Sequence, residues 1–328
     1  MGRSTARARA RFADDVVLEA VRLYVQGLTS YLVLSDLLER RTGRPVSRFA
    51  LNTWVDEVGA RAKTTLELSV ELKPRWGGFL GVDGKAITVA GEECCLLVGV
   101  DHETQDIVHS LVCEKEAGEY FAKLVIEAKL DAGYPLEGLF TDYGKGFVNA
   151  HACSFPVIPW QLCRVHLGRQ LENSIPTLKR SERAAEQAEL KARIRAVLYA
   201  DTYDEACRRW YRLSDERKRF AACHRAGSDS LRHLQTYFGL YTMHHSVPGL
   251  PPDTNVVENV IKQLGKKLGL MEGFATLESA DHFCRLLVAC YRFKRFSDSR
   301  NGNNRRAPLE VAGVDLKGRD WLGSLLAR

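Results

Sequence analysis

"GLFTDYGKGF", residues 138–147, is a short apolar run that ends in an acid and then breaks at a glycine. Leu139 and Phe140 are typical of a buried strand, and Asp142 follows that strand directly. A carboxylate buried beside a strand is unfavourable unless it is paired or bound to a metal. Two interpretations therefore stand: Asp142 caps the next segment as a turn residue, or it is a functional acid.

Strands and helices alternate around this stretch. The pattern predicts two strands in 77–90 around a turn, further strands at 93–101, 106–113, 136–142 and 157–163, and helices at 116–135 and 164–175. This order is typical of a mixed sheet with helices on its faces, so we expect an α/β core. The core is expected in two parts, 76–176 and 246–300, separated by a charged helical insertion at 177–245 and followed by a loosely ordered tail at 301–328.

Three short helices are predicted in residues 14–62, after a basic tail at 1–13 and before a linker at 63–75. The turn "TGRPVS" before the third helix is typical of a helix-turn-helix domain, although any small three-helix bundle would show the same pattern. In a helix-turn-helix domain, Arg48, Asn52 and Thr53 would reach DNA bases. Phe49, Trp54 and Val58 would pack inward, as would Leu34, Leu37 and Leu38 of the second helix.

Composition narrows the classes of function. The net charge is +6, and basic residues cluster at the N-terminus and in 291–306, which suits a polyanion or simply a solvated surface. No stretch approaches the length of apolar sequence that a membrane span needs, and no apolar segment follows the basic N-terminus as in a secretory signal. The nine cysteines sit mostly in apolar contexts, as expected for reduced thiols in a cytoplasmic protein.

Two further acids resemble Asp142 in their placement. Asp83 ends the apolar run "FLGVD", and Glu258 lies beside the apolar stripe of a helix formed by Val257, Ile261, Leu264 and Leu268. Three convergent carboxylates can hold two Mg²⁺ or Mn²⁺ ions for phosphodiester displacement. The alternatives are that Asp83 caps a hairpin turn with Gly84 and that Glu258 pairs with Lys262. Asp101 ends a neighbouring strand and is expected to be a turn residue.

The segments "GVDGK", "TDYGKGF", "QLCRVHLGRQLE" and "TNVVENVIKQLGKKLGLMEGF" resemble the DDE transposases of bacterial insertion sequences, particularly the Mutator-like group. The resemblance covers roughly 76–315 and implies an RNase H-like catalytic core. It implies that Asp83, Asp142 and Glu258 are catalytic metal ligands for two Mg²⁺ or Mn²⁺ ions. His166 would position phosphate or a DNA end and act with the catalytic acids, while Cys163 would be structural.

The resemblance implies a DNA transposase that binds terminal inverted repeats, cuts DNA and joins the freed 3′-OH to a target. It also implies double-stranded DNA as the partner and a homodimer or larger assembly on paired ends. The alternatives are a domesticated DNA-binding protein, a nuclease that cuts without joining, and a transcription factor that uses only residues 14–62. Further candidates for contact with DNA are Lys85, Lys145, Lys262, Lys266 and Trp210.

Two alternatives concern single residues of these motifs. The resemblance implies that Trp210 stacks on a DNA base, and the alternative is that it anchors the core of the helical insertion. Cys163 and His166 could join His151 and Cys153 in a zinc site, although the spacing is irregular for a zinc finger.

Overall fold

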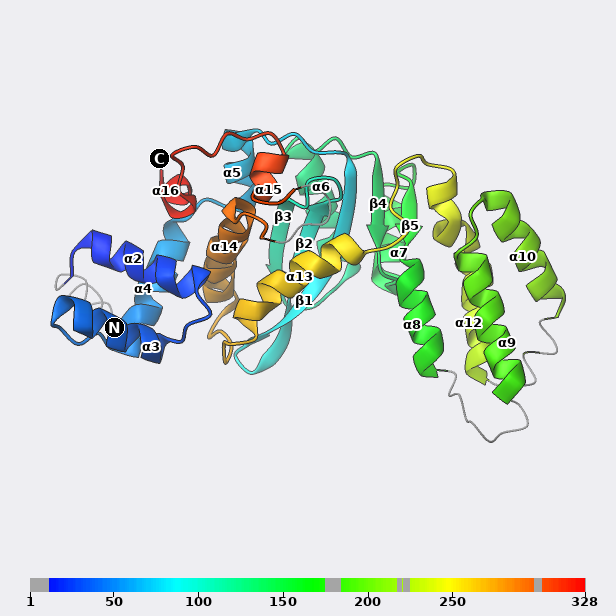
Figure 1. Cartoon of the computed structure of the whole chain (residues 1–328), viewed down its shortest axis with the longest axis horizontal. Coiled ribbons are helices and arrows are strands. Elements are labelled where there is room, and N and C mark those ends of the chain that lie inside the picture. The colour runs from blue at the N-terminus through cyan, green and yellow to red at the C-terminus, as the bar shows by residue number, and fades with distance from the viewer. Residues whose placement is uncertain (1–11, 175–183, 217–219, 221–224, 298–302, 328) are drawn as a thin grey trace. The chain divides into compact units, whose positions relative to one another are not determined.

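The computed structural model describes residues 12–174, 184–216, 220, 225–297 and 303–327 (Figure 1). The chain forms two compact units. The first unit comprises 1–78, 82–135 and 256–328, and the second comprises 79–81 and 136–255. Most of the predicted N-terminal basic tail, 1–11, lies outside the described residues. No helix in the described ranges has both the length and the apolar run that a membrane crossing requires.

A five-stranded mixed sheet confirms the predicted α/β class. Its strands lie in the order β3-β2-β1-β4-β5. β2 and β3 are antiparallel, with Leu97 opposite Leu111, whereas β4 and β5 are parallel, with Phe140 opposite Gln161. The strands are β1 (Phe79–Val89), β2 (Glu92–Asp101), β3 (Ile107–Cys113), β4 (Gly138–Thr141) and β5 (Trp160–Leu162).

The predicted turn at Asp83–Gly84 is wrong, because β1 runs unbroken through both residues. The reversal comes later, at Ala90 and Gly91, where both residues have positive φ angles of 52° and 86°. Two adjacent residues with positive φ suit a two-residue hairpin turn, whose twist matches that of the strands. Asp83 therefore lies within a strand and does not cap a hairpin.

The three N-terminal helices occur where they were predicted, as α2 (Asp14–Gln26), α3 (Tyr31–Thr42) and α4 (Arg48–Arg61). Ser30 and Ser47 cap α3 and α4 by accepting hydrogen bonds from backbone N–H groups of the first turn. Two core predictions are wrong, because Leu37 is 51% and Phe49 is 68% exposed. The predicted linker holds a further helix, α5 (Thr65–Leu72), with a capping box at Thr64.

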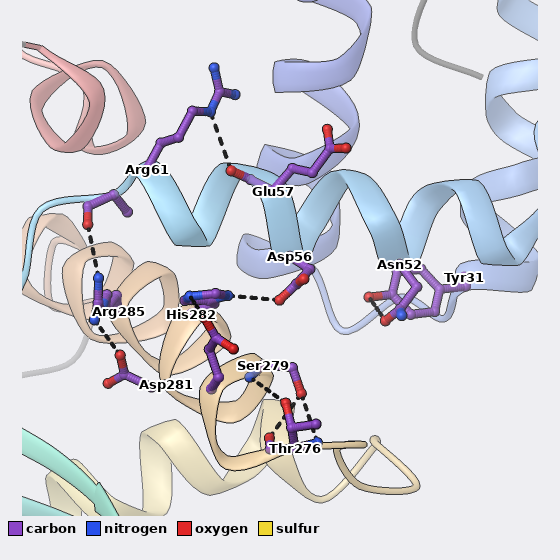
Figure 2. A network of polar contacts seen from close by, with 12 residues as sticks. Tyr31, Asn52, Asp56, Glu57, Arg61, Thr276, Ser279, Asp281, His282 and Arg285 are labelled. Atoms are coloured by element: carbon purple, nitrogen blue, oxygen red, sulfur yellow. Dashed lines mark hydrogen bonds and ion pairs between the residues drawn. The ribbon is translucent and has the colours of Figure 1, made fainter. Parts of the chain in front are cut away.

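Helix α14 (Leu277–Phe293) is the centre of the first unit and packs against α2, α4, α5 and β3. Gly59 of α4 lies so close to α14 that a Cβ atom there would stand 2.5 Å from the carbonyl oxygen of His282. In Figure 2 the imidazole of His282 reaches Asp56 of α4, with Nδ1 and Oδ1 2.8 Å apart. Near the end of α14, the buried Arg292 makes two 2.8 Å hydrogen bonds to Asp106.

Residues 303–327, the described part of the predicted loose tail, are ordered, contrary to that prediction. It contains α15 (Pro308–Val311) and α16 (Trp321–Leu326), and both pack against α14. The indole of Trp321 is 3% exposed, and Asp320 forms an ion pair with Arg22 of α2. Burial of a large aromatic side chain favours folding by about 1.5–3 kcal/mol, which explains why this end of the chain is held.

Helices complete both units. In the first unit, α6 (Gly118–Leu130) packs against β2 and β3, and most of α13 (Asn255–Leu268) belongs there. The second unit is helical beyond its strands, and the predicted strand-free region 177–245 contains no strand among its described residues. Its elements are α7 (Lys145–Ser154), α8 (Arg164–Ser174), α9 (Ala184–Leu198), α10 (Tyr203–Asp215), α12 (Arg225–Thr242) and the short 3₁₀ helix η1 (Met243–His245).

Candidate functional site

Asp142 follows the fully buried strand β4 and is itself half-buried. His166, in the first turn of α8, forms an ion pair with it, with Nδ1 and Oδ1 2.6 Å apart. The hydroxyl of Thr254 donates a hydrogen bond to the same oxygen at 3.1 Å. Among the described residues, both side-chain contacts end on Oδ1.

Thr254 was not predicted as a site residue. It is fully buried immediately before α13, and its backbone N–H donates to the sulfur of Cys163 at 3.4 Å. Arg164, the residue after Cys163, donates its backbone N–H to the carbonyl of Pro252 at 3.3 Å. These two contacts fasten the start of α8 to the segment before α13. In the sequence, the only sign of Thr254 is a threonine directly before a predicted helix, which is equally typical of an ordinary cap.

The ion pair with Asp142 raises the pKa of His166 from 6.5 to about 10, and a hydrogen bond with Cys163 adds to the effect. Burial acts in the opposite direction, because it disfavours the charged form. The imidazole is therefore a cation at neutral pH. A positive charge at this place suits contact with phosphate.

Asp142, Cys163 and His166 bring one potential ligand atom each to within 4.8 Å of one another, a spacing at which a neutral His166 could share a metal ion with the other two. His151 and Cys153 do not join them, although the zinc alternative required both. The Nε2 atom of His151 bonds the carbonyl oxygen of Ile158 at 2.7 Å instead, and Cys153 is exposed. The four-ligand zinc site considered from the sequence is therefore wrong.

The other two predicted acids, Asp83 and Glu258, lie in the first unit and line one open cavity of about 490 Å³. Three lysines share this cavity with the acids, which places opposite charges around one hollow. Its lining is completed by Lys85, Ile261, Lys262, Gly265 and Lys266. The structure thus brings Asp83 and Glu258 together in the first unit, while Asp142 belongs to the second.

Helix α13 explains how Glu258 comes to line this cavity. Its buried face is formed by Val257, Val260, Leu264, Lys267 and Leu268, so Ile261, predicted to be buried, lines the cavity instead. Glu258 borders the buried face, as expected. Lys267 is an unexpected member of that face. Its ammonium lies 3.5 Å from the centre of the Tyr24 ring and donates to the carbonyl of Thr29 at 2.9 Å.

The rival acid Asp101 is a turn residue, as expected. It is fully buried at the end of β2, where it accepts hydrogen bonds from the backbone N–H groups of Gly77 and Thr104, both at 2.9 Å. The hydroxyl of Tyr134 donates to it at 2.7 Å. These contacts are those of a structural carboxylate.

The predicted DNA-reading residues lie in the first half of α4. Arg48 and Asn52 are exposed, and Thr53 is half-buried with its hydroxyl donating to the carbonyl of Phe49 at 3.0 Å. Figure 2 shows Asn52 beside Tyr31, whose hydroxyl donates to the Asn52 amide oxygen at 3.2 Å. The second half of α4 faces α14 instead, through Asp56 and the close approach at Gly59.

Two predicted DNA contacts lie elsewhere in the second unit. Lys145 is exposed at the first position of α7. Trp210 of α10 is half-buried, with its ring centre 5.9 Å from that of Phe238 on α12. This contact fits an anchoring role within the helical region, and the partial exposure leaves part of the indole for a ligand.

Comparison with known protein families identifies a relationship that covers most of the chain. The family model described as "Transposase, Mutator family" matches residues 5–294 of the chain. No curated protein matches it. The matched residues include the whole second unit, the first unit from residue 5 up to residue 294, the N-terminal helices and all the candidate site residues described above.

Proposed function

The chain belongs to the Mutator family of transposases, and we propose that it cuts DNA at the ends of its mobile element and joins the freed 3′-OH to target DNA. In this proposal the mixed sheet is an RNase H-like core, and Asp83, Asp142 and Glu258 act as one catalytic set. The observation that carries the proposal is the cavity in which Asp83 and Glu258 lie among three lysines. Acids that bind cations, surrounded by cations that bind phosphate, suit a phosphodiester substrate.

The donor set fits a hard divalent cation. Asp83 and Glu258 line one cavity, and Asp142 would add a third carboxylate to the set. Carboxylate oxygens are the ligands that Mg²⁺ and Mn²⁺ prefer. Two such ions, when bound, would activate the attacking oxygen and neutralise charge on the leaving one.

The protein side chains would position the DNA. His166 and Thr254 hold Asp142 in one orientation, as second-layer partners commonly do for ligating carboxylates. The imidazolium of His166 would also contact phosphate, while the thiol of Cys163 holds the backbone at Thr254. Lys85, Lys262 and Lys266 would neutralise the phosphates of the strand in the cavity. Lys145 and Trp210 would contact DNA from the second unit.

The N-terminal helices would recognise the element ends as a helix-turn-helix domain. The exposed first half of α4, with Arg48, Asn52 and Thr53, is the part that could enter a major groove. The second half is committed to α14, which would hold the reading helix on the first unit. Double-stranded DNA is thus the proposed partner, bound by a homodimer or larger assembly on paired ends.

Cleavage and joining of DNA test the proposal. Purified protein is mixed with Mg²⁺ or Mn²⁺ and with DNA that carries the sequences flanking its gene, and the nicked and joined products are separated. Glu137, exposed directly before β4, provides a control. Wild type and Glu137→Gln are expected to give both products, whereas Asp83→Asn, Asp142→Asn and Glu258→Gln give neither. Tight binding by the wild type with no cutting would favour the domesticated DNA-binding protein. Cutting without joining would favour the nuclease.

A further inference from the structure

A second hollow lies in the second unit, between α8 and α9. Its volume is about 490 Å³, within the usual range for ligand pockets. Val165, Gly168 and Glu172 line it from one face of α8, while Arg195 of α9 and Tyr199, the residue directly after α9, complete the wall. No role was predicted for this place from the sequence. The full lining is Val165, Gly168, Arg169, Glu172, Asn173, Arg195 and Tyr199.

The hollow is positively charged. Its one acid, Glu172, is already paired with two cations, because Lys191 lies 3.1 Å and Arg195 2.5 Å from its carboxylate oxygens. Arg169 also lines the hollow, and Arg164 adjoins it at Tyr199. The lining itself thus carries two arginines and one acid, with Lys191 and Arg164 beside it, and this excess of positive charge favours an anionic ligand.

An aromatic ring forms part of the wall. Tyr199 is 45% exposed, although a tyrosine usually buries most of its ring. The guanidinium of Arg164 lies over this ring, 4.6 Å from its centre, which holds the ring in place. Nearby, the exposed amide of Asn173 offers both donors and an acceptor. A fixed ring, an amide and a basic wall are the components that bind a nucleobase and its phosphate.

We propose that the α8–α9 hollow binds an unpaired nucleotide of a single DNA strand. The proposal rests on the proposed function, since it assigns part of the same DNA substrate. A base within a duplex has both faces covered by its neighbours and cannot stack on a protein ring, whereas an unpaired base can. Helix α8 links the two places, because His166 lies in its first turn and the hollow follows along the next turns.

Gly168 provides a probe that leaves the fold intact. Among the described residues, and apart from the backbone of its own helix, a Cβ atom at this position would meet no atom within 4 Å, so Gly168→Ala would place a methyl group in the hollow without a clash. Alanine is also the better helix former. Gly239 of α12 is the matched control, because its added Cβ would likewise meet nothing within 4 Å and it does not line the hollow. Tyr199→Ala removes the ring, and Tyr199→Phe retains it.

The experiment measures binding of the full-length protein to a fluorescently labelled single strand and to the duplex of the same sequence, without metal. Gly168→Ala and Tyr199→Ala are expected to weaken single-strand binding about tenfold and to leave duplex binding unchanged. Gly239→Ala should bind as the wild type does, and Tyr199→Phe should restore what Tyr199→Ala loses. Thermal melting checks that each variant is folded.

Three results would overturn the proposal: unchanged single-strand binding by both Gly168→Ala and Tyr199→Ala, an equal loss of single-strand and duplex binding, or failure of Tyr199→Phe to restore binding. The readout does not depend on cleavage. A chain that binds single strands through this hollow but never cuts DNA would refute the proposed function alone, and the reverse result would refute only the hollow.

Discussion

Replacing Thr254 by valine tests whether its hydroxyl holds Asp142. The two side chains have similar shapes, so Thr254→Val removes the 3.1 Å hydrogen bond to Asp142 with little change in packing. A hydrogen bond to a charged group contributes about 1.5–3 kcal/mol. The Asp142 side chain is 32% exposed, so water can replace part of the lost contact. We therefore expect a loss near the lower limit, about 1–1.5 kcal/mol in the free energy of unfolding.

The loss can be measured by urea unfolding followed through tryptophan fluorescence. Trp160 reports on the second unit, because its buried indole donates to the hydroxyl of Thr141 beside Asp142. The effect on DNA cleavage should be larger, about 10–100-fold, since removing a partner of a metal ligand typically has that effect. Thr254→Ser keeps the hydroxyl and should retain most of both properties. Equal stability and equal cleavage for the valine and serine variants would refute the role given to the hydroxyl.

Three more predictions follow from single contacts. Because the pKa of His166 is raised from 6.5 to about 10, its stabilising contribution is complete below about pH 6.5 and is lost as the pH rises towards 10. The free energy of unfolding should therefore fall by about 1–2 kcal/mol over this range in the wild type but not in His166→Gln. Parallel pH profiles for the two proteins would contradict this prediction. Gly59→Ala should lower the free energy of unfolding by about 1–3 kcal/mol through its clash with His282, whereas Gly168→Ala should not lower it. Arg292→Met should lower the free energy of unfolding by about 3–5 kcal/mol, because it leaves the buried carboxylate of Asp106 without its ion-pair partner. A loss below about 1 kcal/mol would show that the fold does not need this ion pair.

Local signals in the sequence were sufficient for most of the helices. Ser30 and Ser47 are ordinary caps, and the apolar spacing after each predicts α3 and α4 within a residue or two. The turn in β1 was misplaced because an Asp-Gly pair is a strong hairpin signal, whereas the actual turn uses Ala90, which has no such signature. In this case the sheet outweighed the local preference for a turn.

Contacts between distant segments set the limit of prediction. In the sequence, the segment with Asp320 and Trp321 looks like part of a polar tail. Its order depends on contacts with distant helices, because Asp320 pairs with Arg22 of α2 and α16 packs against α14. Phe49 was wrongly predicted to be buried for a similar reason. The contacts of α4 with other helices bury other residues of this helix and leave the Phe49 ring exposed.

The candidate site also combines residues that local sequence patterns indicate with a residue that only long-range contacts reveal. Asp83, Asp142 and Glu258 could be proposed from the sequence because of their places beside apolar runs and their resemblance to the family motifs, and their role as one set stays a prediction. Thr254 could not, since its partner Asp142 lies 112 residues away in the sequence. The α8–α9 hollow exists only because two helices meet, and a periodic pattern within either helix does not reveal it.

Binding of Mn²⁺ tests whether Asp83, Asp142 and Glu258 form one metal centre, and it needs no knowledge of the DNA sequence. The concentrations of free and bound Mn²⁺ can be measured by electron paramagnetic resonance while the full-length protein is titrated with Mn²⁺. We expect the wild type and Glu137→Gln to bind Mn²⁺ alike, and Asp83→Asn, Asp142→Asn and Glu258→Gln each to weaken binding by at least about tenfold. An Asp142→Asn variant that binds Mn²⁺ as tightly as the wild type would contradict the claim.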